Sequence, residues 1–193
     1  MNLASFLANK CFEFLLSDAE KGRGHAFLAG RKTGKSAFPP PLIRPPWALA
    51  EQNFRVKCDG CHACLAGCEH NILVAAGDGY PVVDFSRGTC NFCGDCAESC
   101  SRGAFMPGKE CPPWDIKAWI SADCLAHSNV LCRICAENCP EAAIIFPQQA
   151  GTLSVPEVMS QRCSGCGACF SPCPAGAIVM RQGDEYQQTG ESR

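Results

Sequence analysis

The sequence has 193 residues, a length that allows one or two domains. Its formal net charge is −2, so no excess of basic side chains points to nucleic acid as a partner. Eighteen residues are cysteine, about 9% of the chain, which is the range in which disulfide bonds or metal ions usually hold a fold together. The composition therefore makes the cysteines the first features to explain.

The first 46 residues contain no cysteine-rich motif and end in two proline runs, Pro39–Pro41 and Pro45–Pro46. Proline fixes φ and donates no backbone hydrogen bond, so residues 1–46 are expected to form a tail and an extended arm. The most apolar stretch, Phe12–Leu16, is interrupted by Glu13 and is far shorter than the roughly 20 residues of a membrane span. We therefore expect no membrane span, no secretory signal and a cytoplasmic location, where thiols stay reduced.

Sixteen of the cysteines fall into four quartets along the chain. Three quartets share the spacing C-x2-C-x2-C-x3-C, and they are Cys58, Cys61, Cys64 and Cys68; Cys90, Cys93, Cys96 and Cys100; and Cys163, Cys166, Cys169 and Cys173. The irregular quartet has seven residues between its first two cysteines, and it is Cys124, Cys132, Cys135 and Cys139. Three thiolates at this close spacing can surround one iron–sulfur cube. The regular quartets predict three 4Fe–4S clusters with these cysteines as iron ligands, and the irregular quartet predicts a fourth.

In two-cluster ferredoxins the fourth cysteine of each quartet completes the neighbouring cluster. Applied to this chain, the rule predicts four ligand sets. They are Cys58, Cys61, Cys64 and Cys100 (first); Cys90, Cys93, Cys96 and Cys68 (second); Cys124, Cys132, Cys135 and Cys173 (third); and Cys163, Cys166, Cys169 and Cys139 (fourth). The sequence leaves open whether the fourth ligands are crossed or local, and whether the irregular site is occupied. A disulfide framework would need an oxidising compartment, and zinc sites would leave surplus thiolates, so both are disfavoured.

The segments around the quartets predict an α+β fold of tandem bacterial-type 4Fe–4S ferredoxin modules, with short hairpins and short helices around the clusters. The first module is expected at residues 47–106, where Ile72–Val74 and Pro81–Val83 flank an Asp-Gly turn and predict a hairpin. An apolar residue follows each fourth cysteine at the fourth position, namely Ile72, Ala104, Ala143 and Ala177. Modules of about 60 residues are too small for a stable apolar core, so the clusters are expected to form the core.

The second module is expected at residues 123–180, where 144–146 and 155–158 predict a second hairpin across a longer loop. Residues 107–122 are expected to link the modules, with Trp114 and Trp119 packed between them. Residues 181–193 are polar and are expected to be a disordered tail.

Three motifs carry a family resemblance, and they are Ile43-Arg44-Pro45-Pro46-Trp47, the segment from Asp123 to Cys135, and the segment from Ser160 to Cys169. Over about residues 25–180 the chain resembles the NapF family of ferredoxin-type proteins, and residues 1–24 lie outside the resemblance. The family is often credited with three clusters, which leaves the irregular quartet in dispute.

The resemblance implies a cytoplasmic protein that binds the precursor of NapA, the catalytic subunit of periplasmic nitrate reductase, and assists its maturation before export. The sequence shows no Ser-His-Asp set, paired carboxylates or flavin fingerprint, so we do not expect an enzyme. The alternative is a polyferredoxin that carries electrons to a reductase. We also predict that Trp47, at the end of an extended arm, anchors the arm to the NapA precursor, because tryptophans are frequent hot spots. Alternatively, Trp47 covers the first cluster.

Overall fold

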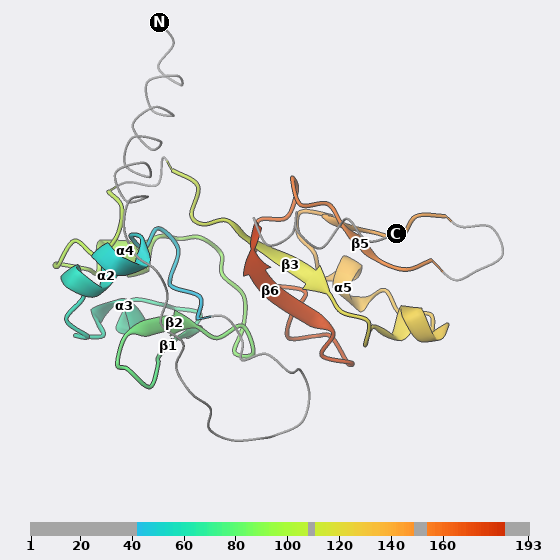
Figure 1. The fold of residues 1–193 in the computed structure, drawn as a ribbon, viewed down its shortest axis with the longest axis horizontal. Coiled ribbons are helices and arrows are strands. Elements are labelled where there is room, and N and C mark those ends of the chain that lie inside the picture. Colours follow the sequence, from blue (N-terminus) through green and yellow to red (C-terminus); the bar gives the residue numbers. More distant parts are fainter. Residues whose placement is uncertain (1–41, 108–110, 149–153, 184–193) are drawn as a thin grey trace, which may run out of the picture.

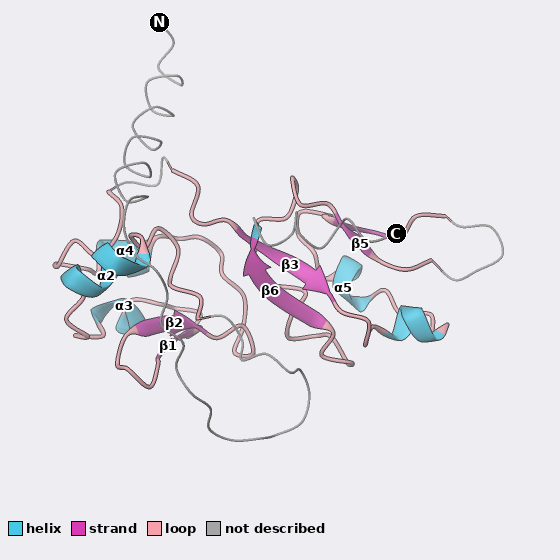
Figure 2. Ribbon diagram, in the orientation of Figure 1, coloured by secondary structure: helices cyan, strands magenta, loops and turns pink. Residues whose placement is uncertain are grey.

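The computed structural model describes residues 42–107, 111–148 and 154–183. Figure 1 shows two groups of elements side by side along the long axis of the molecule. The first group contains α2 (Glu51–Lys57), α3 (Ala63–Ala66), β1 (Leu73–Ala75), β2 (Pro81–Val83) and α4 (Asp95–Glu98). The second contains β3 (Ile116–Ile120), the 3-10 helix η1 (Leu125–Ser128), α5 (Ile134–Glu137), β4 (Ile144–Ile145), β5 (Glu157–Val158) and β6 (Ile178–Gln182). The elements are short and loops join them (Figure 2), as expected for small modules.

Both predicted hairpins are present. Strands β1 and β2 pair antiparallel with Leu73 opposite Val83. Strands β4 and β5 pair in the same sense with Ile144 opposite Val158. Within the described ranges, no helix has the length and apolar character needed to cross a membrane.

The predicted linker contains a strand that the sequence analysis missed. Strand β3 lies within residues 107–122 and pairs antiparallel with β6, with Ile120 opposite Ile178. Ile116 and Ala118 are buried, whereas Lys117 between them is only half-buried. This alternation with period two is the signal that identifies a strand with one buried face. Strand β6 also extends to Gln182, so the second module includes the start of the predicted tail. Residues 1–41 and 184–193 lie outside the described residues.

The molecule has two apolar cores, and cysteines belong to both. The first core includes Phe54, Phe105, Cys64 and Cys96. The second includes Ile116, Ile178, Cys135 and Cys169, together with Ile43 and Phe85 from the segment before the second module. The apolar residues at the fourth position after each quartet, Ile72, Ala104, Ala143 and Ala177, are all buried. The cores therefore form directly around the thiols.

The described end of the proline-rich arm is packed against the first module. The backbone N–H of Val83 donates to the carbonyl of Ile43 at 2.8 Å. The side chain of Arg44 is only 10% exposed, its guanidinium lies 5.2 Å from the ring centre of Phe54, and its Nη1 donates to the carbonyl of Pro81 at 3.0 Å. Residues 43–47 are therefore part of the folded core, in contrast to the expected free arm.

Trp47 is buried as well, with only 4% of its surface exposed. Its Nε1 donates to the carbonyl of Cys111 at 2.9 Å, and its backbone N–H donates to the carbonyl of Pro113 at 2.6 Å. A side chain enclosed in this way cannot anchor a partner, so the prediction of a Trp47 docking anchor is wrong. The ring instead packs against Phe92, which lies in the loop of the second quartet.

The two tryptophans of the predicted linker have different surroundings. Trp114 lies between the modules as predicted, because it contacts Phe85 and Phe92 and its Nε1 donates to the carbonyl of Ser164 at 3.0 Å. Trp119 lies on β3, where the guanidinium of Arg181 on β6 stacks 5.7 Å from its ring centre. This contact lies within the second module, and the packing of Trp119 between the modules stays a prediction.

Candidate iron–sulfur cluster sites

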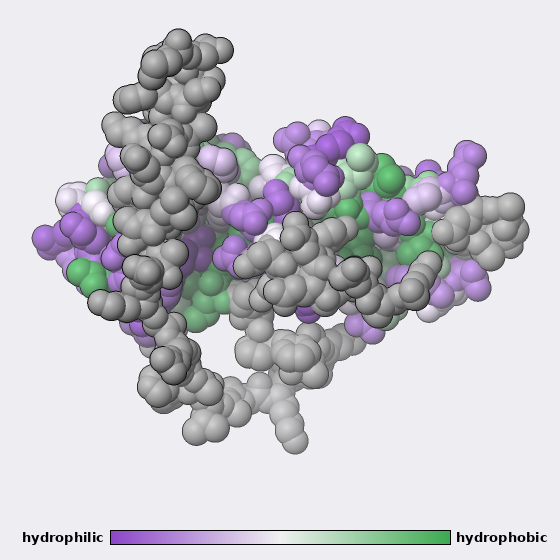
Figure 3. Space-filling model, turned by 45° about the horizontal axis from the view of Figure 1, so that its top comes forward, coloured by the Kyte–Doolittle hydropathy of each residue, from purple (hydrophilic) through white to green (hydrophobic). Residues whose placement is uncertain are grey.

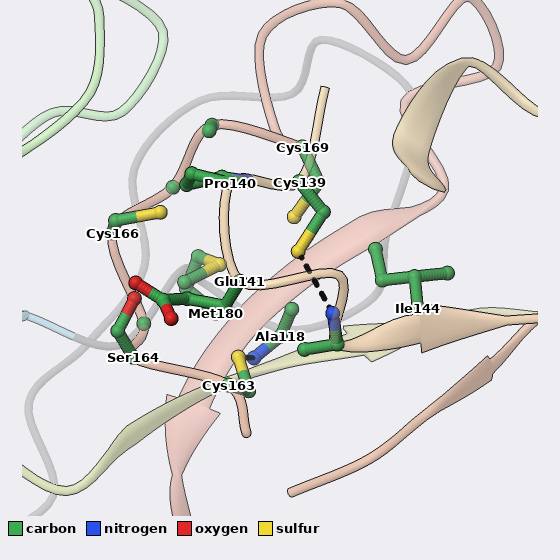
Figure 4. Close-up of a pocket in the computed structure, with 14 residues that line it drawn as sticks. Ala118, Cys139, Pro140, Glu141, Ile144, Cys163, Ser164, Cys166, Cys169 and Met180 are labelled. Carbon is green, nitrogen blue, oxygen red and sulfur yellow. Dashed lines mark hydrogen bonds between the residues drawn. The ribbon is translucent and has the colours of Figure 1, made fainter. Parts of the chain in front are cut away.

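The structure brings cysteines from different quartets together in the crossed arrangement. Three pockets are each lined by three cysteines of one quartet and the fourth cysteine of the other quartet in the same module. These cysteines are Cys58, Cys61, Cys64 and Cys100; Cys124, Cys132, Cys135 and Cys173; and Cys163, Cys166, Cys169 and Cys139. Figure 4 shows the last of these sets around its pocket. The irregular quartet therefore supplies a set of the same composition as the regular ones.

Electrostatic interactions identify the remaining set. Burial is the main cause that raises the pKa of Cys90 to about 11, and the charges of Cys93, Cys68 and Cys166 contribute to the rise. Burial likewise is the main cause that raises the pKa of Cys96 to about 12, with contributions from Cys90, Cys93 and Cys64. These charges act at short range, so Cys68, Cys90, Cys93 and Cys96 are close neighbours, with Cys166 and Cys64 of the adjoining sets beside them. They are the crossed set predicted for the second site.

Every set contains one thiol that is buried more deeply than the others. Burial raises the pKa of Cys64 and of Cys135 to about 11, and that of Cys169 to about 12. A thiolate at such a position needs a compensating positive charge, because its charged form is poorly solvated. Iron provides that charge, so cluster binding would displace protons from these thiols.

Backbone amides donate hydrogen bonds to several cysteine sulfurs. The N–H groups of Ala143 and Ala177 donate to the Sγ atoms of Cys139 and Cys173 at 3.2 and 3.3 Å. The N–H of Ala118 donates to Cys163 Sγ at 3.5 Å; this bond and the bond to Cys139 are drawn in Figure 4. Such bonds stabilise the negative charge of a cluster and tune its potential. The donors therefore fit thiolate ligands of 4Fe–4S clusters.

The spacing of the side chains also fits a cluster better than a single ion. Among the residues that the structure describes, no group of three or more His, Cys, Asp or Glu side chains is placed to hold one metal ion. A single zinc ion draws its ligands to about 2.0–2.3 Å. The four thiols of the first, third and fourth sets instead line a small pocket, as ligation of an iron–sulfur cube requires.

The regular quartets share a backbone conformation on both sides of the second cysteine. The residues in the left-handed region at these positions are Gly60 and His62, Phe92 and Gly94, and Gly165 and Gly167. Two left-handed residues make the chain turn twice within a few residues, so that three thiols point to one side. Glycine explains four of these positions, whereas His62 and Phe92 were not predicted from the sequence.

The irregular quartet reaches the same arrangement by another route. The seven residues after Cys124 begin with η1, which is followed by Asn129 in the left-handed region with φ 58°. The N–H of Val130 donates to the carbonyl of Leu125 at 3.0 Å and closes the excursion on itself. The excursion is therefore a compact loop that returns the chain to Cys132. Its tip is apolar and exposed, since Leu131 is 75% exposed.

Strand β3 holds the loop of the fourth set. Lys117 Nζ donates to the carbonyl of Cys163 at 2.8 Å. A Cβ atom on Gly165 would overlap the backbone oxygen of Ile116, so only glycine allows the loop to approach β3 this closely. Sequence analysis missed the supporting role of Ile116 and Lys117, because both lie in the segment that it treated as a linker.

Comparisons with known proteins agree with the site. The model of the 4Fe–4S dicluster domain matches residues 57–104 and 130–188. Ferredoxin-type protein NapF of Escherichia coli K12 is 42% identical over 137 residues, covering 71% of this chain and 83% of its own length. NapF of Haemophilus influenzae is 44% identical over 138 residues, covering 72% and 78%. The methylamine utilization ferredoxin-type protein MauM of Paracoccus denitrificans is 30% identical over 188 residues, covering 86% and 84%.

These likenesses span both modules, so the protein contains tandem 4Fe–4S dicluster domains and binds several 4Fe–4S clusters. Ferredoxin-type iron–sulfur proteins are generally electron carriers, and the prediction of a ferredoxin-type protein with several clusters is confirmed. The chain belongs to the NapF family of ferredoxin-type proteins.

Proposed function

We propose that this protein assists the maturation of the nitrate reductase subunit NapA in the cytoplasm, before that subunit is exported. The observation that carries the proposal is the 42–44% identity to two NapF proteins over more than two thirds of the chain. The protein would bind the NapA precursor and would perform no substrate chemistry of its own.

All four crossed cysteine sets serve as ligand sets in this proposal. They comprise the twelve cysteines of the regular quartets and Cys124, Cys132, Cys135 and Cys139. Three sets are supported by their grouping in a pocket, and the second set is supported by the electrostatic interactions among its thiols. Backbone N–H groups also donate to sulfurs of the second, third and fourth sets. Bound clusters would supply one-electron redox chemistry. The chain itself orients the thiols and limits the access of water to the buried ones.

Binding to the NapA precursor provides the direct test. Full-length protein, purified without oxygen and checked for iron, is immobilised and offered NapA with and without its export signal. We expect retention of the precursor and little retention of the mature subunit. Equal retention of both forms, or of neither, contradicts a role before export.

A second candidate function is electron transfer to a redox enzyme. The observation in its favour is the 30–32% identity to MauM proteins, whose names refer to methylamine utilization. A ferredoxin-type module is therefore compatible with different redox systems, and recognition of NapA is the more specific claim.

A deletion strain separates the two functions. If the protein is a maturation factor, NapA from the strain should be inactive even with an artificial electron donor such as reduced viologen. If the protein is an electron carrier, NapA from the same strain should be fully active with that donor. Activity of NapA in both the artificial and the physiological assay contradicts both functions.

A further inference from the structure

A continuous series of aromatic side chains joins the two modules. Trp47 packs against Phe92 with ring centres 6.5 Å apart, and Phe92 packs against Trp114 at 5.6 Å. Trp114 contacts Phe85 at 6.0 Å, and Phe85 contacts Phe170 at 6.2 Å. The rings meet edge-on or tilted, which is the favourable geometry for aromatic pairs. We call these five residues the aromatic junction.

The aromatic junction connects two particular cysteine loops. Phe92 lies between Cys90 and Cys93 in the second quartet, and Phe170 lies between Cys169 and Cys173 in the last quartet. A Cβ atom on Gly167 would overlap the ring of Phe85, so this ring lies directly on the loop of the last quartet. The junction therefore joins the loop of the second set to the loop of the fourth set.

A backbone hydrogen bond between the two loops reinforces the junction. The N–H of Cys90 donates to the carbonyl of Cys166 at 2.9 Å. Trp114 fixes the same loop, because its Nε1 donates to the carbonyl of Ser164 at 3.0 Å. One cysteine of the second set is thus in direct contact with one cysteine of the fourth set.

The contact between the cysteine loops of the two modules involves the second and fourth sets. The backbone bond across the junction joins Cys90 to Cys166, and neither residue belongs to the first or third set. Within each module, cysteines of the two sets alternate along the chain. Cys64 belongs to the first set, and Cys68, one helical turn later, belongs to the second. Neighbouring sets are therefore connected within each module by the chain, and between modules by the junction.

We propose that the junction makes the second and fourth cluster sites direct neighbours, so that the four sites form one row in the order first, second, fourth, third. The proposal rests on the ligand sets proposed above and is independent of the role in NapA maturation. In such a row the first and third sites lie at the two ends. Two different partners would therefore contact the protein at two separate places, one near each end of the row.

Two double variants of the full-length protein test this order. Cys61→Ala/Cys132→Ala leaves the second and fourth sites, and Cys93→Ala/Cys163→Ala leaves the first and third. Iron analysis should give about eight irons per chain in both, because each retained cube holds four. After full reduction, electron paramagnetic resonance should detect magnetic interaction between clusters in the first variant and two isolated clusters in the matched second variant.

A loaded first variant without interaction, or equal interaction in both variants, overturns the order. Iron content that does not fall to about eight irons refutes the ligand sets, which is a separate failure.

Hydrogen exchange on the holoprotein with all its cysteines is a second test of the junction, and it applies even if a double variant fails to fold. The Cys90 amide should exchange slowly, because it is bonded across the junction. In Trp114→Ala the peptides containing Cys90 and residues 164–167 should together exchange about tenfold faster or more, since a ring contact and a hydrogen bond are lost. Fast exchange at Cys90 in the unaltered protein, or unchanged exchange in the variant, overturns the proposed junction.

Discussion

Replacing Trp47 with alanine should destabilise the protein strongly, because this buried side chain packs against the loop of the second quartet and bonds to the segment before β3. A buried tryptophan contributes about 3–5 kcal/mol relative to alanine. Part of that loss is the edge-on contact with Phe92, worth about 0.5–1.5 kcal/mol beyond burial. Another part is the hydrogen bond to the carbonyl of Cys111, worth about 1 kcal/mol. The backbone bonds of residue 47 can persist, so we expect a total near 3–4 kcal/mol.

Anaerobic urea unfolding measures this effect. Cluster absorbance and far-UV circular dichroism should both change at a lower urea concentration in Trp47→Ala than in the unaltered protein. Trp119→Ala is the matched control, because it removes the same side chain from a half-buried position on β3 outside the aromatic junction. Equal stability of Trp47→Ala and the unaltered protein, combined with weaker binding of the NapA precursor, would restore the docking role and refute the reasoning from burial.

Three further outcomes are expected from the cluster sites. The unaltered protein should contain on the order of sixteen irons per chain, and Cys132→Ser should contain about twelve; an iron content near twelve in both proteins removes the third set. Removal of iron by a chelator should unfold the modules and not only bleach them, since cysteines line both cores; an apo-protein that keeps its circular dichroism and protease resistance contradicts this. Gly165→Ala should lower the iron content by about four irons per chain, because its Cβ would overlap a backbone oxygen of β3. Gly103→Ala is the control and should keep its iron, because Gly103 has the same left-handed conformation (φ 67°) but no neighbouring atom within 4 Å of the added Cβ. Equal iron content in the two variants would show that the contact with β3 is unimportant.

The ligand groupings and hairpins were predictable because they depend on local spacing. Three cysteines two residues apart, with a glycine at a sharp turn, restrict a loop to few conformations. The Asp-Gly turn before Pro81–Val83 similarly specifies a hairpin. Even the crossed fourth ligands follow from the rule for two-cluster ferredoxins, and the structure groups the cysteines in that way.

The long-range contacts were not predictable from the same local rules. Strand β3 pairs with β6 about sixty residues later in the chain. The alternation of apolar and polar residues in β3 covers only five positions after two prolines, and it does not indicate which strand is the partner. Trp47 follows a proline-rich run that is extended in isolation, but its ring is buried by residues from the second quartet and from the segment before β3. Tertiary packing thus determines the structure of both segments, and local preferences alone did not specify it.

The exposed apolar residues do not form one continuous surface on the face shown in Figure 3, where hydrophobic and hydrophilic areas alternate over the described residues. Large exposed apolar side chains include Leu42, Val56 and Leu131, which lie in different parts of the chain. On this face a partner would therefore meet local apolar contacts and not one broad apolar patch.

Crossed ligation has a consequence for the order in which the protein is made. In the proposed sets the first site needs Cys100 and the second needs Cys96, so neither can be complete until almost the whole first module has left the ribosome. Both then become available within a few residues of each other. The second module waits in the same way for Cys173, near the end of the described chain. In the proposed sets, synthesis therefore divides cluster insertion into two separate events, each of which fills two sites. A ribosome that stops between Cys100 and Cys173 leaves an incomplete chain in which only the two sites of the first module can be filled.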